Sequence, residues 1–347
     1  MGTVNVPMAS PGSPASSPQV HPVDDRTGRG IHVYRVTKYD PADRNGAGHY
    51  VGPEDVYSDH GAVEEAYLAS VAAFAEETGI THLTIREPEV TGFVNFGVEP
   101  PIDGHGLAGL FPPDLTGYHD GAQVPISVAL ELVRAMLRDN GAWCRLEAED
   151  QFFVHVGYDQ YVYVGSALPC PHAVALTHQR GLFAEPINQS PYDPQLDEDD
   201  SARRRPADDA FWAELNALLS RQGAVLLEEG YLSNASRWHR ITLDGVAPIR
   251  SRLTPRARLL IWPDLSTNVD AALASLPNDS LVEIVWQNPQ GHITSLTADE
   301  AEYPALSAIL AEAHAVLILS CYEDERTPLM AAVMPDPDGV LRARWMP

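Results

Sequence analysis

Three segments typical of β-strands follow one another within residues 142–165, and their close spacing strongly constrains the fold. They cover 142–148, 152–156 and 161–165. Connections this short join antiparallel strands, because parallel strands need a long crossover. The acidic turn Glu147-Ala-Glu-Asp150 suits the first of these connections. The chain is therefore expected to contain an antiparallel sheet.

Helix-type and strand-type patterns surround this region without a regular alternation. Apolar residues recur at three- and four-residue steps over 61–78 and 125–139, which predicts helices. Residues 31–36 and 81–86 alternate as strands do. Further helices are predicted over 171–180, 209–221, 267–275 and 298–313, further strands over 223–229, 237–242, 257–262, 281–287 and 314–320, and a hairpin over 329–344. The predicted fold class is α+β, with mainly antiparallel or mixed sheets.

Composition divides the chain into four parts. Residues 1–30 are rich in Pro, Ser and Gly and are predicted to be a disordered tail. Residues 185–208 combine prolines with separate acidic and basic runs, which is typical of a solvated linker. We therefore expect one mixed α+β domain over 31–184 and a second over 209–347.

Both predicted domains are acidic. The 347 residues include 23 Lys+Arg and 48 Asp+Glu, for a formal net charge of −25. Residues 31–187 contribute −14 and residues 188–347 contribute −11. A chain of this charge is a poor direct ligand for nucleic acid or for an anionic membrane surface. It is suited to rapid association with a basic protein partner.

Cysteine usage favours the cytoplasm. Cys144, Cys170 and Cys321 are widely spaced and form no C-x-x-C pair, so a disulfide framework is not expected. The first residues lack a secretory signal pattern, and no run of 18 apolar residues is present. Cys144 and Cys321 are predicted to be buried, and Cys170, between two prolines, to be exposed.

An aromatic hairpin over 152–166 is the first candidate site. Its residues Tyr158, Asp159, Tyr161 and Tyr163 are predicted to bind the partner, because tyrosines are common interface anchors. A second interpretation pairs His155 with Asp159 for acid–base chemistry. A third is structural: aromatic residues suit strands, and a packed ribbon would hold His155 by a hydrogen bond.

The Gly- and Pro-rich segment 88–122 is the second candidate site. It contains His105 and His119 together with three aspartates, but their spacing matches no zinc or calcium pattern. Phosphate-binding glycine motifs and the nucleophile elbow are absent from the sequence. The sequence therefore predicts no metal site and no cofactor.

Two functions remain as hypotheses, and acidity as a mere solubility trait is a third interpretation. The first is an acidic cytosolic protein that binds a basic protein, as immunity proteins and inhibitors of basic nuclease toxins do. The alternative is a hydrolase whose site unites four side chains in a cleft between the first sheet and the 88–122 segment. Those side chains are His105, His119, His155 and Asp159.

Overall fold

The protein is described by a computed structural model that covers most of the chain. The described residues are 30–52, 61–90, 106–157, 160–193, 205–233, 235–277, 280–322 and 325–342. Apart from Gly30, the predicted tail lies outside them, and so do residues 194–204 of the predicted linker. Contacts group Ile31–Pro347 into one compact unit. The division of this unit into two domains stays a prediction.

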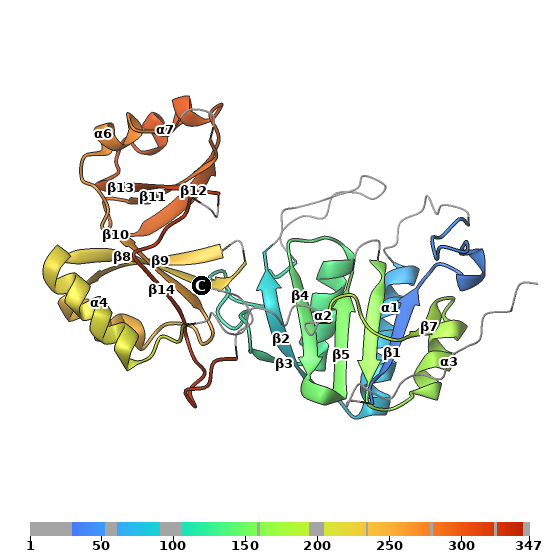
Figure 1. The fold of residues 1–347 in the computed structure, drawn as a ribbon. Helices are drawn as coiled ribbons and strands as arrows, with labels where there is room; N and C mark the ends of the chain where they lie inside the picture. Colours follow the sequence, from blue (N-terminus) through green and yellow to red (C-terminus); the bar gives the residue numbers. More distant parts are fainter. Residues whose placement is uncertain are drawn as a thin grey trace, which may run out of the picture. The chain divides into compact units, whose positions relative to one another are not determined.

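A seven-stranded antiparallel sheet occupies the first half of the chain (Figure 1). Its order is β3-β2-β4-β5-β6-β1-β7, so the three closely spaced segments lie side by side, as predicted. The strands are β1 (His32–Thr37), β2 (His82–Glu89), β3 (Gln123–Pro125), β4 (Trp143–Ala148), β5 (Phe152–Val156), β6 (Val162–Ser166) and β7 (Phe183–Ile187).

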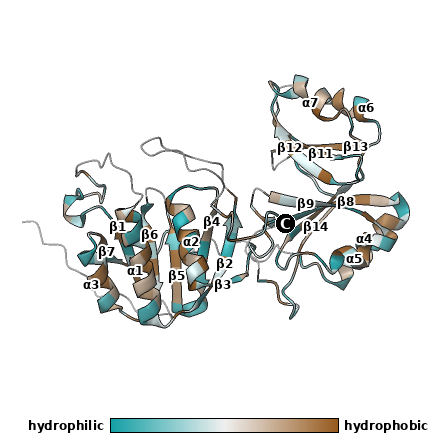
Figure 2. Ribbon diagram, turned by 180° about the vertical axis from the view of Figure 1, so that it is seen from behind, coloured by the Kyte–Doolittle hydropathy of each residue, from teal (hydrophilic) through white to brown (hydrophobic). Residues whose placement is uncertain are grey.

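Three helices cover one face of this sheet, as the views from its two sides show (Figures 1 and 2). They are α1 (Ala62–Thr78), α2 (Ile126–Leu137) and α3 (Pro171–Gln179). Strand alternation turns Phe152, Val154 and Val156 of β5 into the core that the helices close. Gly79 ends α1 in the left-handed conformation (φ 78°), which glycine adopts without a steric penalty.

The second half forms four layers (Figure 1). A first apolar cluster joins α4 to a four-stranded sheet of order β14-β10-β8-β9. A second cluster, which includes Trp238, Trp262 and Val285, lies between that sheet and a three-stranded sheet of order β12-β11-β13. A third cluster packs the three-stranded sheet against the outer helical layer. Each sheet therefore buries both of its faces.

The elements of these layers are short and follow one another closely. They are α4 (Asp209–Gln222), β8 (Ala224–Leu232), β9 (Ala235–Thr242), α5 (Val246–Arg250), β10 (Arg258–Pro263), α6 (Val269–Leu273), β11 (Val282–Gln287), β12 (Ile293–Ala298), α7 (Tyr303–Ile309), β13 (Ala315–Ser320) and β14 (Met330–Val333).

The α+β class is confirmed, and some local predictions need correction. Strands β3, β7 and β12 and helix α5 were not predicted, and α7 is shorter than the predicted helix 298–313. β7 extends the first sheet three residues into the predicted linker. The turn of the hairpin predicted over 329–344 is present, since the N–H of Gly339 donates to the carbonyl of Asp336 at 2.8 Å. However, β14 pairs with β10 rather than with the residues after the turn.

Candidate functional site

The face of the seven-stranded sheet opposite the helices carries a row of polar side chains. Strand register places these residues next to one another on six consecutive strands. Across the sheet the row reads Arg86, Arg145, His155, Tyr163, Arg35 and Glu185. The aromatic hairpin therefore lies in the middle of the sheet, and its outward-facing residues belong to this row.

His155, at the centre of the row, is buried. Residues 188–193, which follow β7, contribute Ser190 and Tyr192 to its surroundings. The Ser190 hydroxyl lies 2.9 Å from Nδ1 of His155 and accepts the Tyr192 N–H at 3.2 Å. Phe153 stacks on the imidazole with ring centroids 4.4 Å apart. Burial lowers the pKa of His155, so the ring is neutral at pH 7.

The two ring nitrogens of His155 face different groups. Nδ1 shares a hydrogen bond with the Ser190 hydroxyl, which also accepts the Tyr192 N–H. Nε2 lies 3.7 Å from Oε1 of Glu147. A serine hydroxyl, an imidazole and a carboxylate therefore follow one another, and a general-base relay uses the same order of groups. Ser190 is only 1% exposed, however, so its hydroxyl is enclosed and is not presented to a substrate.

Arg145 holds the same covering segment from the neighbouring strand. Its guanidinium forms an ion pair with Glu87 and donates from Nη1 to the Tyr192 carbonyl at 2.8 Å. The Tyr192 ring lies 5.8 Å from the ring of Trp143 and 5.9 Å from that of Tyr163. Residues 190–192 are thus bound to the sheet by hydrogen bonds and by aromatic packing.

The structure describes two of the four residues of the predicted hydrolase site, His119 and His155. His119 bonds through Nδ1 to the Asp120 carbonyl at 2.9 Å. Over the described ranges, no hydrogen bond or ion pair joins it to His155. His105, Tyr158 and Asp159 lie outside the described residues. Ser190, Glu147 and Arg145 surround His155 instead. Strand alternation could have placed Arg145 and Glu147 on one face, but no local pattern marks Ser190.

The two described tyrosines of the predicted partner-binding set have different environments. Tyr163 is half-buried beside Tyr192, and burial raises its pKa. Tyr161 lies beneath two guanidinium groups, those of Arg35 and Arg44, at 5.7 and 5.4 Å from the ring centroid. Arg44 also donates to the Tyr161 hydroxyl at 3.3 Å. Both arginines also pair with Glu185, at 2.6 and 3.9 Å, so two guanidinium groups and one carboxylate lie around Tyr161.

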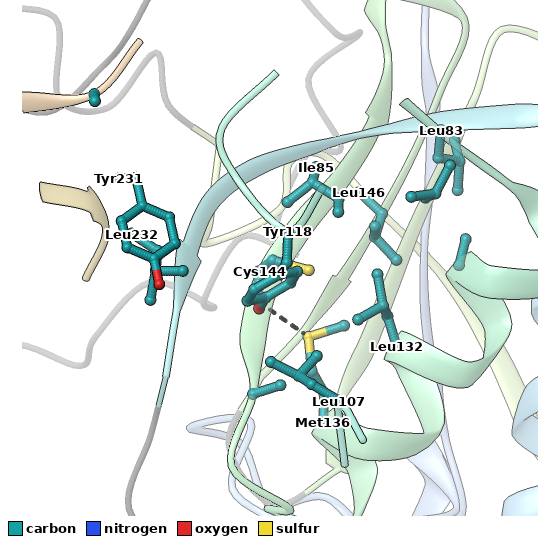
Figure 3. Close-up of a cluster of buried hydrophobic side chains, with 14 of the residues drawn as sticks. Leu83, Ile85, Leu107, Tyr118, Leu132, Met136, Cys144, Leu146, Tyr231 and Leu232 are labelled. Carbon is teal, nitrogen blue, oxygen red and sulfur yellow. Dashed lines mark hydrogen bonds between the residues drawn. The ribbon is translucent and has the colours of Figure 1, made fainter. Parts of the chain in front are cut away.

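The cysteines form no reactive centre in the described part of the chain. Cys144 packs with Tyr118 and Met136 in the core (Figure 3), and burial raises its pKa to about 12. Its N–H donates to Sδ of Met136 at 3.3 Å. Cys170, predicted to be exposed, is buried beside Ser166. Cys321, predicted to be buried, is half-buried.

Charge is distributed unevenly in the second half. Residues 264–325, which we call the acidic module, contain 11 acidic residues and no lysine or arginine. The rest of 188–347 contains 13 acidic and 13 basic residues, so the whole excess lies in the module. It is built from β11, β12 and β13 with α6 and α7. Its exposed described carboxylates are Asp270, Asp299, Glu300, Glu302, Glu312 and Glu325.

Arginines outside the module neutralise only its inner side. Arg240 of β9 forms a bidentate pair with Asp264, with both contacts at 2.7 Å. Arg326 contacts Glu283 at 2.8 Å and the buried Glu228 of β8 at 2.9 Å. It therefore bridges the two stacked sheets, whereas the carboxylates of the outer layer are exposed to solvent.

Two kinds of feature are absent from the described ranges. No cluster of His, Cys, Asp and Glu there has the arrangement of a metal site. Within the same ranges, no helix has the length and hydrophobicity needed to cross a bilayer.

Comparison of the chain with models of known families, with characterised proteins and with solved structures returns no match. The function of this protein is therefore inferred from the residues of its own chain alone.

Proposed function

We propose that this protein binds a basic protein partner through its acidic module, as an immunity protein or inhibitor does. The single observation that supports this proposal is the distribution of charge in the second half. Its entire net charge of −11 lies in residues 264–325, where no lysine or arginine is present. The six exposed described carboxylates lie on the two outer layers of the fold.

Charges of one sign without nearby opposite charges produce an electric field that attracts or repels a partner before the two proteins touch. The Debye length is about 8 Å at physiological ionic strength, so neighbouring carboxylates of the module reinforce one another at its surface. Such a field speeds encounter with a partner of opposite charge and repels acidic competitors. This is the behaviour required of an inhibitor that must capture a basic toxin quickly.

The module is a better docking surface for such a partner than the aromatic hairpin. The hairpin residue Tyr161 lies beneath Arg35 and Arg44, which pair with the single carboxylate of Glu185, so this position offers a basic partner no excess of negative charge. We therefore place the proposed interface on the second half of the chain rather than on the tyrosines first predicted from the sequence.

Two charge-matched triple variants test the proposal. Asp270→Asn/Glu300→Gln/Glu312→Gln removes three exposed charges from the module, and Glu76→Gln/Glu149→Gln/Asp244→Asn removes three exposed charges elsewhere. The probe is a synthetic peptide of alternating arginine and serine, with binding measured by calorimetry at low salt. We expect the module variant to bind about tenfold more weakly and the control to bind almost as the wild type does.

The same pair of variants tests a natural partner. Proteins retained by the wild type at low ionic strength and eluted by salt would be purified and measured individually. A basic protein whose affinity falls in the module variant alone supports the proposal. Equal affinity of the two variants for the peptide, or binding that does not change with salt, would overturn it.

A further inference from the structure

The covering segment, residues 188–193, lies against the face of the first sheet opposite the helices without being part of that sheet. It begins where β7 ends, and β7 is paired with β1 up to Ile187 and Val33. Among the described residues, no backbone hydrogen bond joins the covering segment to a strand. The covering segment can therefore leave the sheet without breaking a strand ladder.

Residues of the sheet hold the covering segment in place. His155 shares a hydrogen bond with the Ser190 hydroxyl at 2.9 Å. Arg145 donates to the Tyr192 carbonyl at 2.8 Å. The Tyr192 ring lies over Gly157, where a Cβ would be only 2.8 Å from it, so this glycine makes room for the ring. Contacts of this kind can open locally while the strands of the sheet stay paired.

The covering segment determines the environment of His155. The titratable groups that face the ring or its neighbours are Glu147 and Arg145 of β4, Glu87 of β2, which pairs with Arg145, Tyr163 of β6, and Tyr192 and Asp193 of the covering segment. While the segment is in place the imidazole is buried, and this loss of hydration is the largest effect on its pKa, which is lowered. The negative charges of Glu147 and Asp193 act in the opposite direction, whereas Arg145 adds to the lowering.

We propose that the covering segment is a lid that opens as the solution becomes acidic, because opening hydrates His155 and lets the imidazole take up a proton. In the open state the pKa of this histidine returns to its ordinary value of about 6.5. A proton then binds the open state more tightly than the closed one, so acid shifts the population toward the open state. Opening uncovers the middle of the polar row, with Arg145 and His155. This inference is independent of the proposed function, which rests on the acidic module.

Hydrogen exchange of the full-length protein tests the lid between pH 7.5 and pH 5.5. Mass spectrometry would follow the amides of Tyr192 and Asp193, with each rate divided by its intrinsic rate at the same pH. We expect the protection of these amides to fall about three- to tenfold toward pH 5.5. This fall should be absent from His155→Gln, whose side chain does not titrate, and should persist in His119→Gln.

Tyr192→Ala is a second test that leaves His155 in place. Loss of the ring should lower the protection of the covering segment about tenfold at pH 7.5. The matched control Tyr322→Ala, at an exposed tyrosine of the second half, should not change this protection.

The amides of β5 distinguish a local opening from global unfolding. They should stay more strongly protected than the covering segment at each pH, because the strand ladders remain intact when the lid opens. The inference is overturned by wild-type protection that does not change with pH, or by a fall that persists in His155→Gln. Equal protection of the covering segment and β5 at each pH would also overturn it, since the segment would then open only when the whole protein unfolds.

Discussion

The hydroxyl of Ser190 lies 2.9 Å from Nδ1 of His155, and both side chains are buried. The two residues are 35 positions apart, on a central strand and on the segment that covers it. This bond fixes the covering segment to the sheet, and burial, which lowers the pKa of His155, keeps the imidazole neutral. His155 looked catalytic in the sequence, and the partner that the structure gives it is a structural one.

The stability of the protein should depend on pH through His155. Burial lowers its pKa in the folded state, whereas the unfolded value is about 6.5. The unfolded chain therefore binds the extra proton first, and stability falls as the pH drops below about 6.5 toward the lowered value. Urea unfolding from pH 8 to pH 5 should show this slope. His155→Gln should flatten it and His119→Gln should not. An unchanged slope in His155→Gln would contradict the assignment.

Ser190→Ala should destabilise the fold without changing any hydrolytic activity. The buried imidazole Nδ1 loses its hydrogen-bond partner, which costs about 1–3 kcal/mol. Denaturant unfolding measures this loss, and Ser220→Ala, at an exposed hydroxyl of α4, is the control. Because Ser190 is enclosed, wild-type protein should not react with a serine-directed phosphonate. Labelling at Ser190 would show instead that the hydroxyl is accessible.

Arg326→Met should be among the costly single changes in the second half. It removes the cation that contacts Glu283 and leaves Glu228 buried between the sheets, which costs about 3 kcal/mol. The loss appears as a lower urea midpoint. Arg205→Met breaks the exposed pair with Glu214 and the contact of the guanidinium with the Phe211 ring, and should cost about 1 kcal/mol or less. Similar losses in the two variants would show that the pair with Glu228 contributes little.

Gly121→Ala should cost more than Gly109→Ala. Both glycines have a left-handed φ, of 85° and 83°, so each alanine carries a backbone penalty of about 1–2 kcal/mol. At Gly121 a Cβ would also meet the Arg256 guanidinium at 2.5 Å, whereas nothing lies within 4 Å at Gly109. Arg256 would be pushed from its bonds to Asp336. Equal melting temperatures for the two variants would contradict this packing.

One thiol should react in the folded protein. Cys144 and Cys170 are fully buried, and burial raises the pKa of Cys144 to about 12, so neither should form a mixed disulfide with an aromatic disulfide reagent. Cys321 is half-buried and should react slowly. All three should react in denaturant, and Cys321→Ser should remove the native signal.

Local periodicity was enough to predict the central elements. Strands β4, β5 and β6 and helix α1 lie within a residue or two of their predicted ranges, because alternation and three- to four-residue spacing record burial directly. Strand β12 was missed because its polar threonines obscure the pattern, although Asn288 and Gly291 mark the turn before it. β7 was missed because prolines and acids surround this edge strand.

The candidate site was less predictable than the fold. The sequence identified His155 as a candidate but did not indicate the described residues that surround it in the structure. Glu147 and Arg145 come from an adjacent strand, and Ser190 comes from a segment without a recognisable pattern. Contacts of this kind depend on how distant segments fold together, which no local spacing records.

The sequence by itself determined the α+β class, the antiparallel centre of the first sheet, the net charge of −25 and the absence of basic residues from 264–325. Only the tertiary structure decided which carboxylates are neutralised. Glu64 pairs with Arg134, 70 positions away, and Asp264 pairs with Arg240, whereas Glu300 and Glu312 stay exposed. The reason is that an ion pair requires close approach in space, and folding, not position along the chain, brings these groups together.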